Sequence, residues 1–131
     1  SWSTLQVEVG PVTTVRLNRP DKRNAQSLEM WDELRRVGLD LQDDPAVRVV
    51  VLCGAGHSFS AGIDLTVLFG AGAAGLPEPE LVQQSFAWLR EARFATVALV
   101  QGYALGAGLQ LALACDLRIL AEDAEICVLL P

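Results

Sequence analysis

The sequence predicts an α/β domain whose central sheet is largely parallel. Three apolar runs, at residues 48–53, 96–100 and 117–121, have the length and continuous apolar character of strands in a sheet covered on both faces. Segments with helical periodicity lie between these runs, and strands that alternate with helices typically form a parallel sheet. The 131 residues, of which 51% are apolar, suffice for one compact domain with a core and argue against disorder.

The chain is predicted to begin with a β-hairpin and a helix. Residues 5–9 and 12–18 alternate apolar and polar side chains, as half-buried strands do, and a Gly-Pro pair separates them. After a polar loop at residues 19–24, Ser27 is a suitable cap for a helix that ends at the Asp-Asp-Pro sequence of residues 43–45. The predicted buried face of this helix carries apolar residues at helical spacing: Trp31, Leu34, Val37 and Leu41.

The middle of the chain is predicted to place a small-residue segment at the end of a strand. Residues 54–65 are rich in small side chains and directly follow the run at 48–53, and ligands of open α/β sheets bind at such strand ends. Residues 69–80 are rich in Gly, Ala and Pro, which predicts a mobile loop. A helix is expected at about residues 80–94, with four side chains inward: Leu81, Phe86, Leu89 and Phe94.

The last third of the chain is predicted to hold a buried helix between two strands. Residues 101–103 form a turn, and residues 106–108 open a helix that is apolar almost all round, so this helix must be buried. Asp116 ends the helix, and the chain stops inside a strand-like apolar run at 125–131. Natural C-termini are usually polar and frayed. We therefore expect a fragment of a longer protein, with a naturally short protein as the alternative.

Charge and hydropathy exclude several classes of partner. The net charge of −6 and the pI of about 4.6 argue against a nucleic-acid or membrane-surface binder, which would need a basic face. We find no signal peptide before the first predicted strand, and no apolar run reaches the roughly 18–20 residues that span a bilayer. A local basic cluster could still bind an anionic small ligand: Arg16, Arg19, Lys22 and Arg23.

The cysteines predict neither a metal site nor a disulfide. Cys53, Cys115 and Cys127 are odd in number, lie among apolar neighbours, and show no metal-ligand spacing such as C-x-x-C. We expect reduced, buried thiols in a cytoplasmic protein.

Two glycine-containing segments, residues 61–65 and 102–108, each follow a predicted strand. Small residues let a ligand approach the backbone closely. If the segments lie side by side, each can direct one N–H at the same point, and such a pair forms an oxyanion hole for a carbonyl oxygen. Simple turns would give the same pattern, and neither segment matches a dinucleotide or P-loop fingerprint.

Three ordered segments resemble the crotonase (enoyl-CoA hydratase/isomerase) superfamily: LNRPDKRNAQSLEMWDEL, VVVLCGAGHSFSAGIDL and VQGYALGAGLQLALACDLRILAEDAEI. The resemblance runs from about residue 5 to residue 131, and family members are about twice this length. It implies that residues 1–131 are the N-terminal part of a crotonase-like acyl-CoA-binding domain, an incomplete spiral of β-β-α units without its C-terminal part. Members usually assemble as homo-oligomers, either trimers or hexamers built from two trimers.

The resemblance also implies a site for a coenzyme A thioester, with coenzyme A as part of the substrate and no covalently bound cofactor. The backbone N–H groups of Ile63 and Ala107 would stabilise the thioester enolate; many members have glycine at the second position. The adenine pocket would be formed by Ala61, Asp64, Leu65 and Thr66. The pantetheine and phosphates would lie along Lys22, Arg23 and Ala25, although a solvated turn is the alternative for the two basic residues. His57 is expected on a loop surface.

The acid–base residues are where the sequence departs from the family. Hydratases use two glutamates to activate one water, and Gln110 occupies the position of the first. An amide cannot act as a general base. The second glutamate would follow Pro131, where the sequence ends. The remaining nearby carboxylates, Asp64 and Asp116, are interpreted as structural, one orienting the first glycine segment and the other closing a helix.

Three functions remain open at this point. The first is an enzyme of fatty-acid or acyl-CoA metabolism, a lyase or isomerase, in which case the 131-residue chain alone would be weakly active or inactive. Gln110 fits a single-carboxylate activity, such as double-bond isomerisation, better than a two-glutamate hydratase. The second is an acyl-CoA-binding protein without hydratase activity. The third is a half-domain that exists only in an assembly, because half of a family core would expose a large apolar face.

Overall fold

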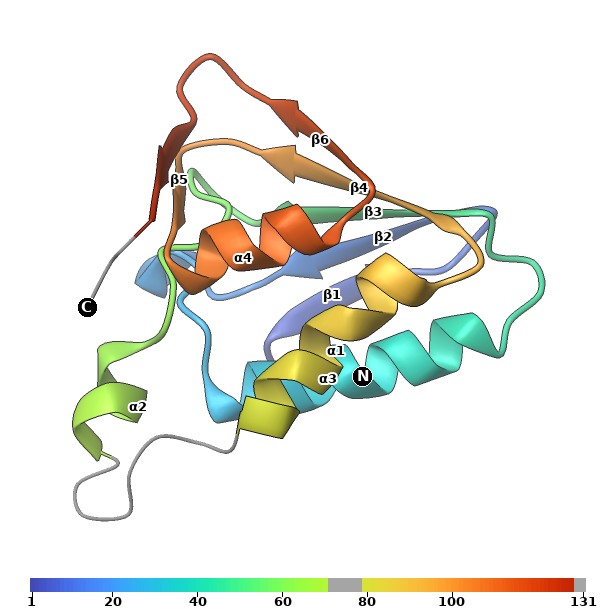
Figure 1. Cartoon of the computed structure of the whole chain (residues 1–131), viewed down its shortest axis with the longest axis horizontal. Coiled ribbons are helices and arrows are strands. Elements are labelled where there is room, and N and C mark those ends of the chain that lie inside the picture. Colours follow the sequence, from blue (N-terminus) through green and yellow to red (C-terminus); the bar gives the residue numbers. More distant parts are fainter. Residues whose placement is uncertain (71–78, 129–131) are drawn as a thin grey trace.

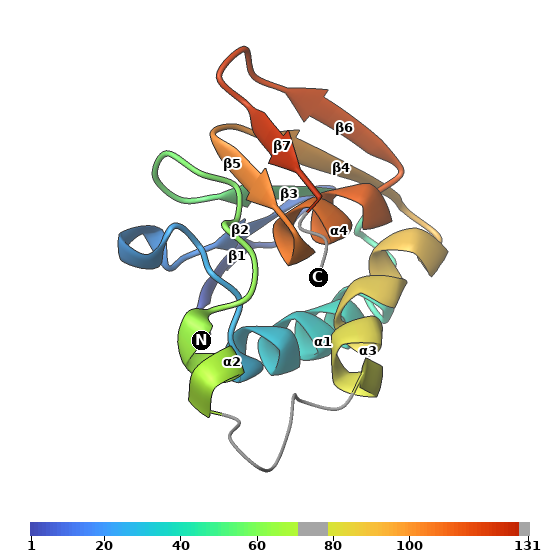
Figure 2. The same cartoon turned by 60° about the vertical axis from the view of Figure 1, so that its left-hand side comes forward.

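The computed structural model describes residues 1–70 and 79–128. Within them, a five-stranded sheet has the order β1-β2-β3-β4-β6, and β5 pairs with β7 in a separate two-stranded sheet (Figures 1 and 2). The strands are β1 (Leu5–Glu8), β2 (Val12–Leu17), β3 (Val49–Gly54), β4 (Ala95–Val100), β5 (Tyr103–Leu105), β6 (Leu117–Leu120) and β7 (Glu125–Cys127). Only the β1–β2 pair is antiparallel among these, which confirms the N-terminal hairpin and the parallel character of the sheet.

The helices follow the periodicity of the sequence. They are α1 (Leu28–Gln42), α2 (Leu65–Gly70), α3 (Pro79–Glu91) and α4 (Ala107–Ala114), with a short 3-10 helix at Pro20–Lys22 in the predicted polar loop. The Ser27 hydroxyl accepts a hydrogen bond from the Met30 N–H at 3.2 Å, so the predicted cap of α1 is confirmed. All four predicted inward side chains of α1 are buried.

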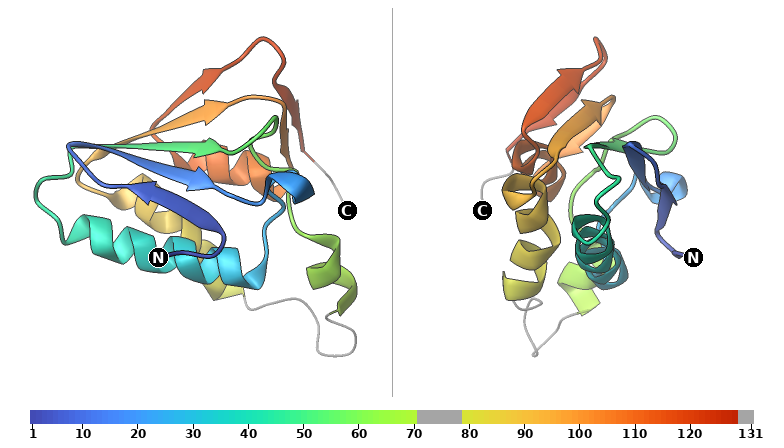
Figure 3. Two further views of the ribbon diagram at one scale, coloured as in Figure 1. Left: turned by 180° about the vertical axis from the view of Figure 1, so that it is seen from behind. Right: turned by 90° about the vertical axis from the view of Figure 1, so that its right-hand side faces the viewer.

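The core lies between one face of the sheet and the helices α1, α3 and α4 (Figure 1). On β3, Val50 and Leu52 are fully buried under the helices, whereas Val51 and Cys53 on the other face are only half-buried. In the view from behind, no described helix crosses the strands (Figure 3). The prediction that the inner strands are covered on both faces is therefore wrong for this outer face. Apolar side chains on both faces of a strand do not specify what covers each face.

The strongest departure from the sequence prediction is strand β6, which is exposed instead of buried. Leu117 and Ile119 are each 61% exposed and Leu120 is 52% exposed. The physical reason is topological, because β6 is the edge strand of the described sheet and pairs only with β4. Helix α4 is likewise buried on one side only, since Leu111 is fully buried while Leu113 is 53% exposed. Leu117 and Ile119 pair in register with Val97 and Leu99 and so lie on the outer face of the sheet, away from α4. Within the described residues, α4 and β6 therefore expose apolar side chains on different sides of the sheet.

The cysteine prediction is also wrong in part. Cys115 is buried, and this burial raises the pKa of its thiol to about 12. Cys53 is half-buried and Cys127 is exposed on β7, so the expectation of three buried thiols does not hold. The neighbouring residues of Cys127 are apolar, but β7 pairs only with the short strand β5, and this small sheet leaves the thiol uncovered.

Two elements were not predicted, and one predicted loop cannot be compared. Residues 65–70 form α2, and residues 103–105 form β5, which begins at the last residue of the turn expected at 101–103. Of the predicted loop at 69–80, residues 71–78 lie outside the described residues, as does the predicted role of Pro131. The helix expected at 80–94 is α3, which ends at Glu91, and Phe94 is buried beyond its end.

A buried carboxylate ties the N-terminus to α1. Glu33, only 6% exposed, accepts hydrogen bonds from the Ser3 N–H at 2.8 Å, the Thr4 N–H at 2.7 Å and the Thr4 hydroxyl at 2.5 Å. Burial raises the pKa of Glu33, but the hydrogen bonds from Thr4 and Ser3 outweigh burial and hold it below its ordinary value. The ionised carboxylate is therefore the form that holds the start of β1.

Candidate functional site

Three segments that follow strands β2, β3 and β4 meet at the carboxyl ends of the parallel strands. The Gln26 N–H donates to the Gly62 carbonyl at 2.7 Å, and the Asp64 N–H donates to the Gln26 carbonyl at 2.8 Å. The Leu105 N–H donates to the Ser60 carbonyl at 3.1 Å. Segment 60–64 is thus bonded on one side to Gln26 and on the other to β5. The two glycine-containing segments lie side by side, which is the arrangement that an oxyanion hole requires.

The backbone geometry leaves two N–H groups at this junction without a hydrogen bond to any residue in 1–70 or 79–128. The Gly62 carbonyl points at Gln26, and in a planar trans peptide the N–H lies opposite the carbonyl. The N–H of Ile63 therefore points away from Gln26. Ala107 is the first residue of α4, so its N–H has no partner within the helix, whose first bond runs from the Gln110 N–H to the Gly106 carbonyl at 3.1 Å. Ile63 and Ala107 border the same cavity, which has a volume of about 1190 Å³.

Two glycines permit this close approach. Gly62 has φ of 104°, which L side chains rarely adopt, and a Cβ there would lie 2.9 Å from the Leu105 carbonyl oxygen. A Cβ on Gly108 would overlap the carbonyl oxygen of Ser60. Larger residues at either position would separate segment 60–64 from the start of α4.

All ten site residues named from the sequence line this one cavity: Lys22, Arg23, Ala25, Ala61, Ile63, Asp64, Leu65, Thr66, Ala107 and Gln110. They come from four places in the chain, namely residues 22–25 at and after the end of the 3-10 helix, segment 61–64, the start of α2 and the start of α4. The structure therefore brings them together, while their individual roles belong to the proposal below.

Asp64 organises the loop at the mouth of the cavity. Its Oδ1 accepts hydrogen bonds from the Thr66 N–H at 2.9 Å and from the Thr66 hydroxyl at 2.8 Å, and its Oδ2 pairs with Arg19 at 2.9 Å. The Thr66 N–H, then the Thr66 hydroxyl and, to a smaller extent, Arg19 hold the pKa of Asp64 below its ordinary value. The predicted orienting role of Asp64 is confirmed. Asp116 also has a structural role, since its Oδ2 accepts from the Thr96 N–H at 2.9 Å at the start of β4.

The predicted basic cluster is divided between two places. Arg16 lies on the hairpin, where it pairs with Glu8 at 3.6 Å, and does not line the cavity. Arg19 forms an ion pair with Asp64, and its Nη1 donates a hydrogen bond to the Ala25 carbonyl at 2.6 Å. Lys22 and Arg23 line the cavity, with the Arg23 guanidinium 5.7 Å from the centroid of the Tyr103 ring. These last two residues are the cations that a ligand in this cavity would meet.

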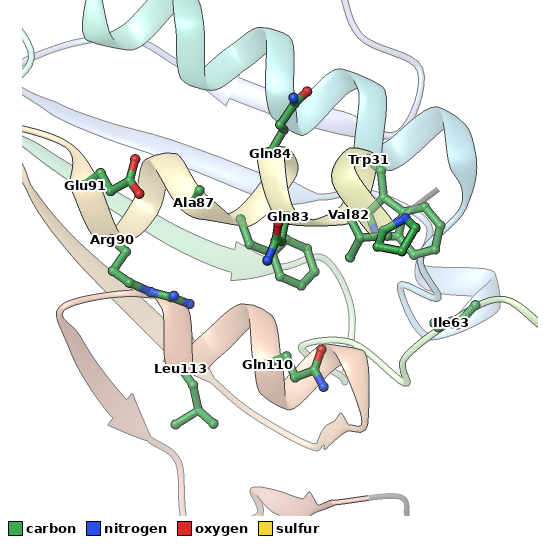
Figure 4. A pocket seen from close by; sticks show the side chains of 12 residues that line it. Trp31, Ile63, Val82, Gln83, Gln84, Ala87, Arg90, Glu91, Gln110 and Leu113 are labelled. Carbon is green, nitrogen blue, oxygen red and sulfur yellow. The ribbon is translucent and has the colours of Figure 1, made fainter. Parts of the chain in front are cut away.

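A second cavity of about 830 Å³ lies between α3 and α4 (Figure 4). Its wall is largely apolar and includes Trp31, Val82 and Phe86, with Arg90 extended from α3 toward α4. Ile63 and Gln110 line both cavities, so the two spaces meet at the junction described above. This wall of α3 was not predicted to be part of the site, although Phe86 was predicted to point inward. Its signal is the spacing of four residues between Val82, Phe86 and Arg90, which places them on one helix face.

Gln110 projects from α4 near the Ile63 end of the second cavity (Figure 4). Its side chain is exposed and makes no hydrogen bond with any residue in 1–70 or 79–128. His57 is exposed on its loop, as predicted, and lines neither cavity. No cluster of three or more His, Cys, Asp or Glu side chains in the described ranges could hold a metal ion. None of the described helices is long and apolar enough to cross a membrane.

Comparison with known proteins agrees with this fold. The family model for enoyl-CoA hydratase/isomerase matches residues 8–129, and the chain belongs to this family. Over 133 aligned residues it is 39% identical to a hydroxycinnamoyl-CoA hydratase-lyase of Pseudomonas fluorescens, covering 94% of this chain and 47% of that protein.

Solved structures show the same relationship. A "putative enoyl-CoA hydratase" from Thermobifida fusca, solved in complex with acetoacetyl-CoA, is 42% identical with a TM-score of 0.82, covering 94% of this chain and 52% of that one. AtuE of Pseudomonas aeruginosa is 40% identical with a TM-score of 0.88, covering 95% and 50%. The chain thus spans about half the length of the relatives that it matches. The incomplete crotonase fold expected from the sequence is confirmed.

Proposed function

We propose that the protein to which these residues belong binds an acyl-CoA thioester and stabilises its enolate with the N–H groups of Ile63 and Ala107. The observation that carries this proposal is the pair of available N–H groups at the border of one cavity. Preorganised N–H donors stabilise negative charge on a carbonyl oxygen as it develops, and such donors each contribute roughly 3–4 kcal/mol to catalysis in known enzymes. The acetoacetyl-CoA in the Thermobifida fusca relative supports a thioester ligand.

We assign each part of the ligand to one of the two cavities. The coenzyme A moiety would lie in the 1190 Å³ cavity, with its phosphates near Lys22 and Arg23 and its adenine near Ala61, Asp64, Leu65 and Thr66. The acyl chain would enter the 830 Å³ cavity between α3 and α4, whose apolar wall suits a hydrocarbon. The thioester carbonyl would then lie where the cavities meet, beside Ile63. If Lys22 and Arg23 only form a solvated turn, their removal will leave coenzyme A affinity unchanged.

Gln110 limits the chemistry. An amide can hold a water or a substrate oxygen by hydrogen bonds but cannot accept a proton as a general base. Among the described residues, two acidic side chains line this cavity with Gln110, namely Asp21 on the 3-10 helix and Asp64, which is engaged with Thr66 and Arg19. We assign neither the role of the missing carboxylate. We propose a lyase or isomerase of acyl-CoA metabolism that uses one carboxylate beyond Pro131. The second candidate, favoured by Gln110 itself, is an acyl-CoA binder without hydratase activity.

Turnover of a short trans-2-enoyl-CoA by the full-length natural protein tests the proposal. The wild type is compared with Gln110→Glu, and Gln6→Glu on the exposed side of β1 serves as the control for an added charge. A slow wild type and a gain of about 100-fold or more in Gln110→Glu alone would mean that the site lacks only the first base. Fast turnover by the wild type would show that one carboxylate suffices and that Gln110 does not limit the chemistry. Failure of all three to bind acyl-CoA would contradict the proposal.

The assembly is also part of the proposal. We propose that the full-length protein forms a homo-oligomer and that its remaining residues or subunits cover the exposed apolar side chains of α4 and of β6. The 131-residue chain alone is expected to associate and to be weakly active or inactive, which size-exclusion chromatography and the same assay would check.

A further inference from the structure

Gln26 is a fully buried polar side chain at the centre of the junction. Its Nε2 donates to the Ala107 carbonyl at 3.1 Å and to the Ser60 hydroxyl at 3.3 Å. Its Oε1 accepts from the Trp31 indole N–H at 2.8 Å. A buried polar group whose donors and acceptor are all used holds its neighbours in one arrangement, because a broken bond leaves an unsatisfied group.

The backbone of the same residue holds the other half of the junction. The Gln26 N–H and carbonyl bond to Gly62 and Asp64, on either side of Ile63, at 2.7 and 2.8 Å. Gln26 therefore fixes Ile63 through its backbone and the first turn of α4 through its side chain. It is separated from Ala107 by 81 positions in the sequence, so this bond joins two distant segments.

We infer that Gln26 is a positioning residue that sets the separation of the Ile63 and Ala107 N–H groups, and this inference rests on the proposed function. An oxyanion hole works only when both donors lie within about 2.7–3.1 Å of the developing oxyanion. A misplacement of about 1 Å costs on the order of 100-fold in rate. Gln26 touches neither substrate nor reacting atoms in this account, and it acts through the two segments that it joins.

Trp31 extends this network to the acyl side. Its indole N–H binds Gln26, and its ring forms part of the wall of the cavity between α3 and α4. The side-chain amide of Gln26 thus joins the wall of the proposed acyl cavity to the segments that carry the two proposed N–H donors.

The test compares Gln26→Met, which keeps the length of the side chain but removes its hydrogen bonds, with wild type in the full-length protein. Ser85→Ala is the matched control, because Ser85 is also fully buried and bonds the Trp31 and Leu81 carbonyls but touches neither glycine segment. The readout is the stretching frequency of the ¹³C-labelled thioester carbonyl of bound acyl-CoA. We expect wild type and Ser85→Ala to lower this frequency relative to water. Gln26→Met should lose most of the shift and about 10- to 100-fold in kcat, with KM changed much less.

A second variant keeps the inference falsifiable if Gln26→Met does not fold. The carboxyl of Gln26→Glu can donate to the Ala107 carbonyl only while protonated, so the carbonyl shift should disappear as pH rises through the pKa of that group. Wild type has no such group and should keep its shift over the same range. A Gln26 variant that keeps the full wild-type shift at every pH would overturn the inference alone. A wild type that binds acyl-CoA without any carbonyl shift would overturn the proposed oxyanion hole, and the inference with it.

Discussion

Gly108→Ala should separate the two halves of the proposed oxyanion hole. The added Cβ would overlap the Ser60 carbonyl oxygen and lie 2.9 Å from the Ser60 carbonyl carbon, whereas ordinary contacts begin at 3.4 Å. Relief of the overlap requires a movement of about 1 Å between the start of α4 and segment 60–64, which is enough to cost on the order of 100-fold in rate. The strain of adding one methyl to a packed site typically lowers the free energy of unfolding by about 1–3 kcal/mol.

Urea unfolding and turnover of an enoyl-CoA by the full-length protein measure these two effects. Gly10→Ala is the matched control, because a Cβ at Gly10 meets only the Val12 carbonyl oxygen at 3.6 Å and lies in the β1–β2 turn. We expect the control to match wild type in both measurements. If Gly108→Ala unfolds at the wild-type urea concentration and keeps wild-type turnover, then α4 does not pack against Ser60 as described, and the account of the junction is wrong.

Two further predictions concern buried or paired carboxylates. Asp64→Asn should weaken coenzyme A binding measured by calorimetry, with the exposed Asp40→Asn as control. Because the pKa of Asp64 is lowered, this carboxylate stabilises the loop fully above about pH 4, the ordinary Asp value. The stabilisation is lost as pH falls through the lowered pKa. An affinity for coenzyme A that persists at lower pH in wild type and variant alike would contradict this prediction. Glu33→Gln should lower the free energy of unfolding by about 1.5–3 kcal/mol near neutral pH, and the difference should vanish in acid, below the lowered pKa of Glu33. A urea midpoint equal to that of wild type at neutral pH would refute the second prediction.

The sequence alone was sufficient to predict elements that depend on one continuous segment of the chain. The Ser27 cap and the helical spacing of apolar residues in α1 are properties of one continuous segment, and the structure confirms both. The exposure of β6 could not be predicted in this way, because a run of apolar residues has the same composition at an edge as in the interior of a sheet. Helix α2 was missed because it is only six residues long, too short for periodicity to be visible.

The residues of the candidate site likewise fall into those that the sequence could predict and those that it could not. The resemblance supplied ten of the residues that line the 1190 Å³ cavity, since its motifs keep those residues in fixed positions relative to the strands. The wall of α3 and the role of Gln26 depend on contacts between segments distant in the sequence, such as Gln26 with Ala107. Neither composition nor periodicity carries that information, and a glutamine that follows a polar loop gives no sign that it will be fully buried.

The most direct test of enolate stabilisation is the ionisation of acetoacetyl-CoA bound to the full-length protein. The enolate of this β-keto thioester absorbs in the ultraviolet, so its pKa can be measured for the free and the bound ligand. If the Ile63 and Ala107 N–H groups stabilise the enolate, the bound ligand should ionise at a pH lower by about one unit or more, and each unit corresponds to about 1.4 kcal/mol. Tight binding with an unchanged or raised pKa would contradict the account, because the protein would then bind the thioester without stabilising its enolate.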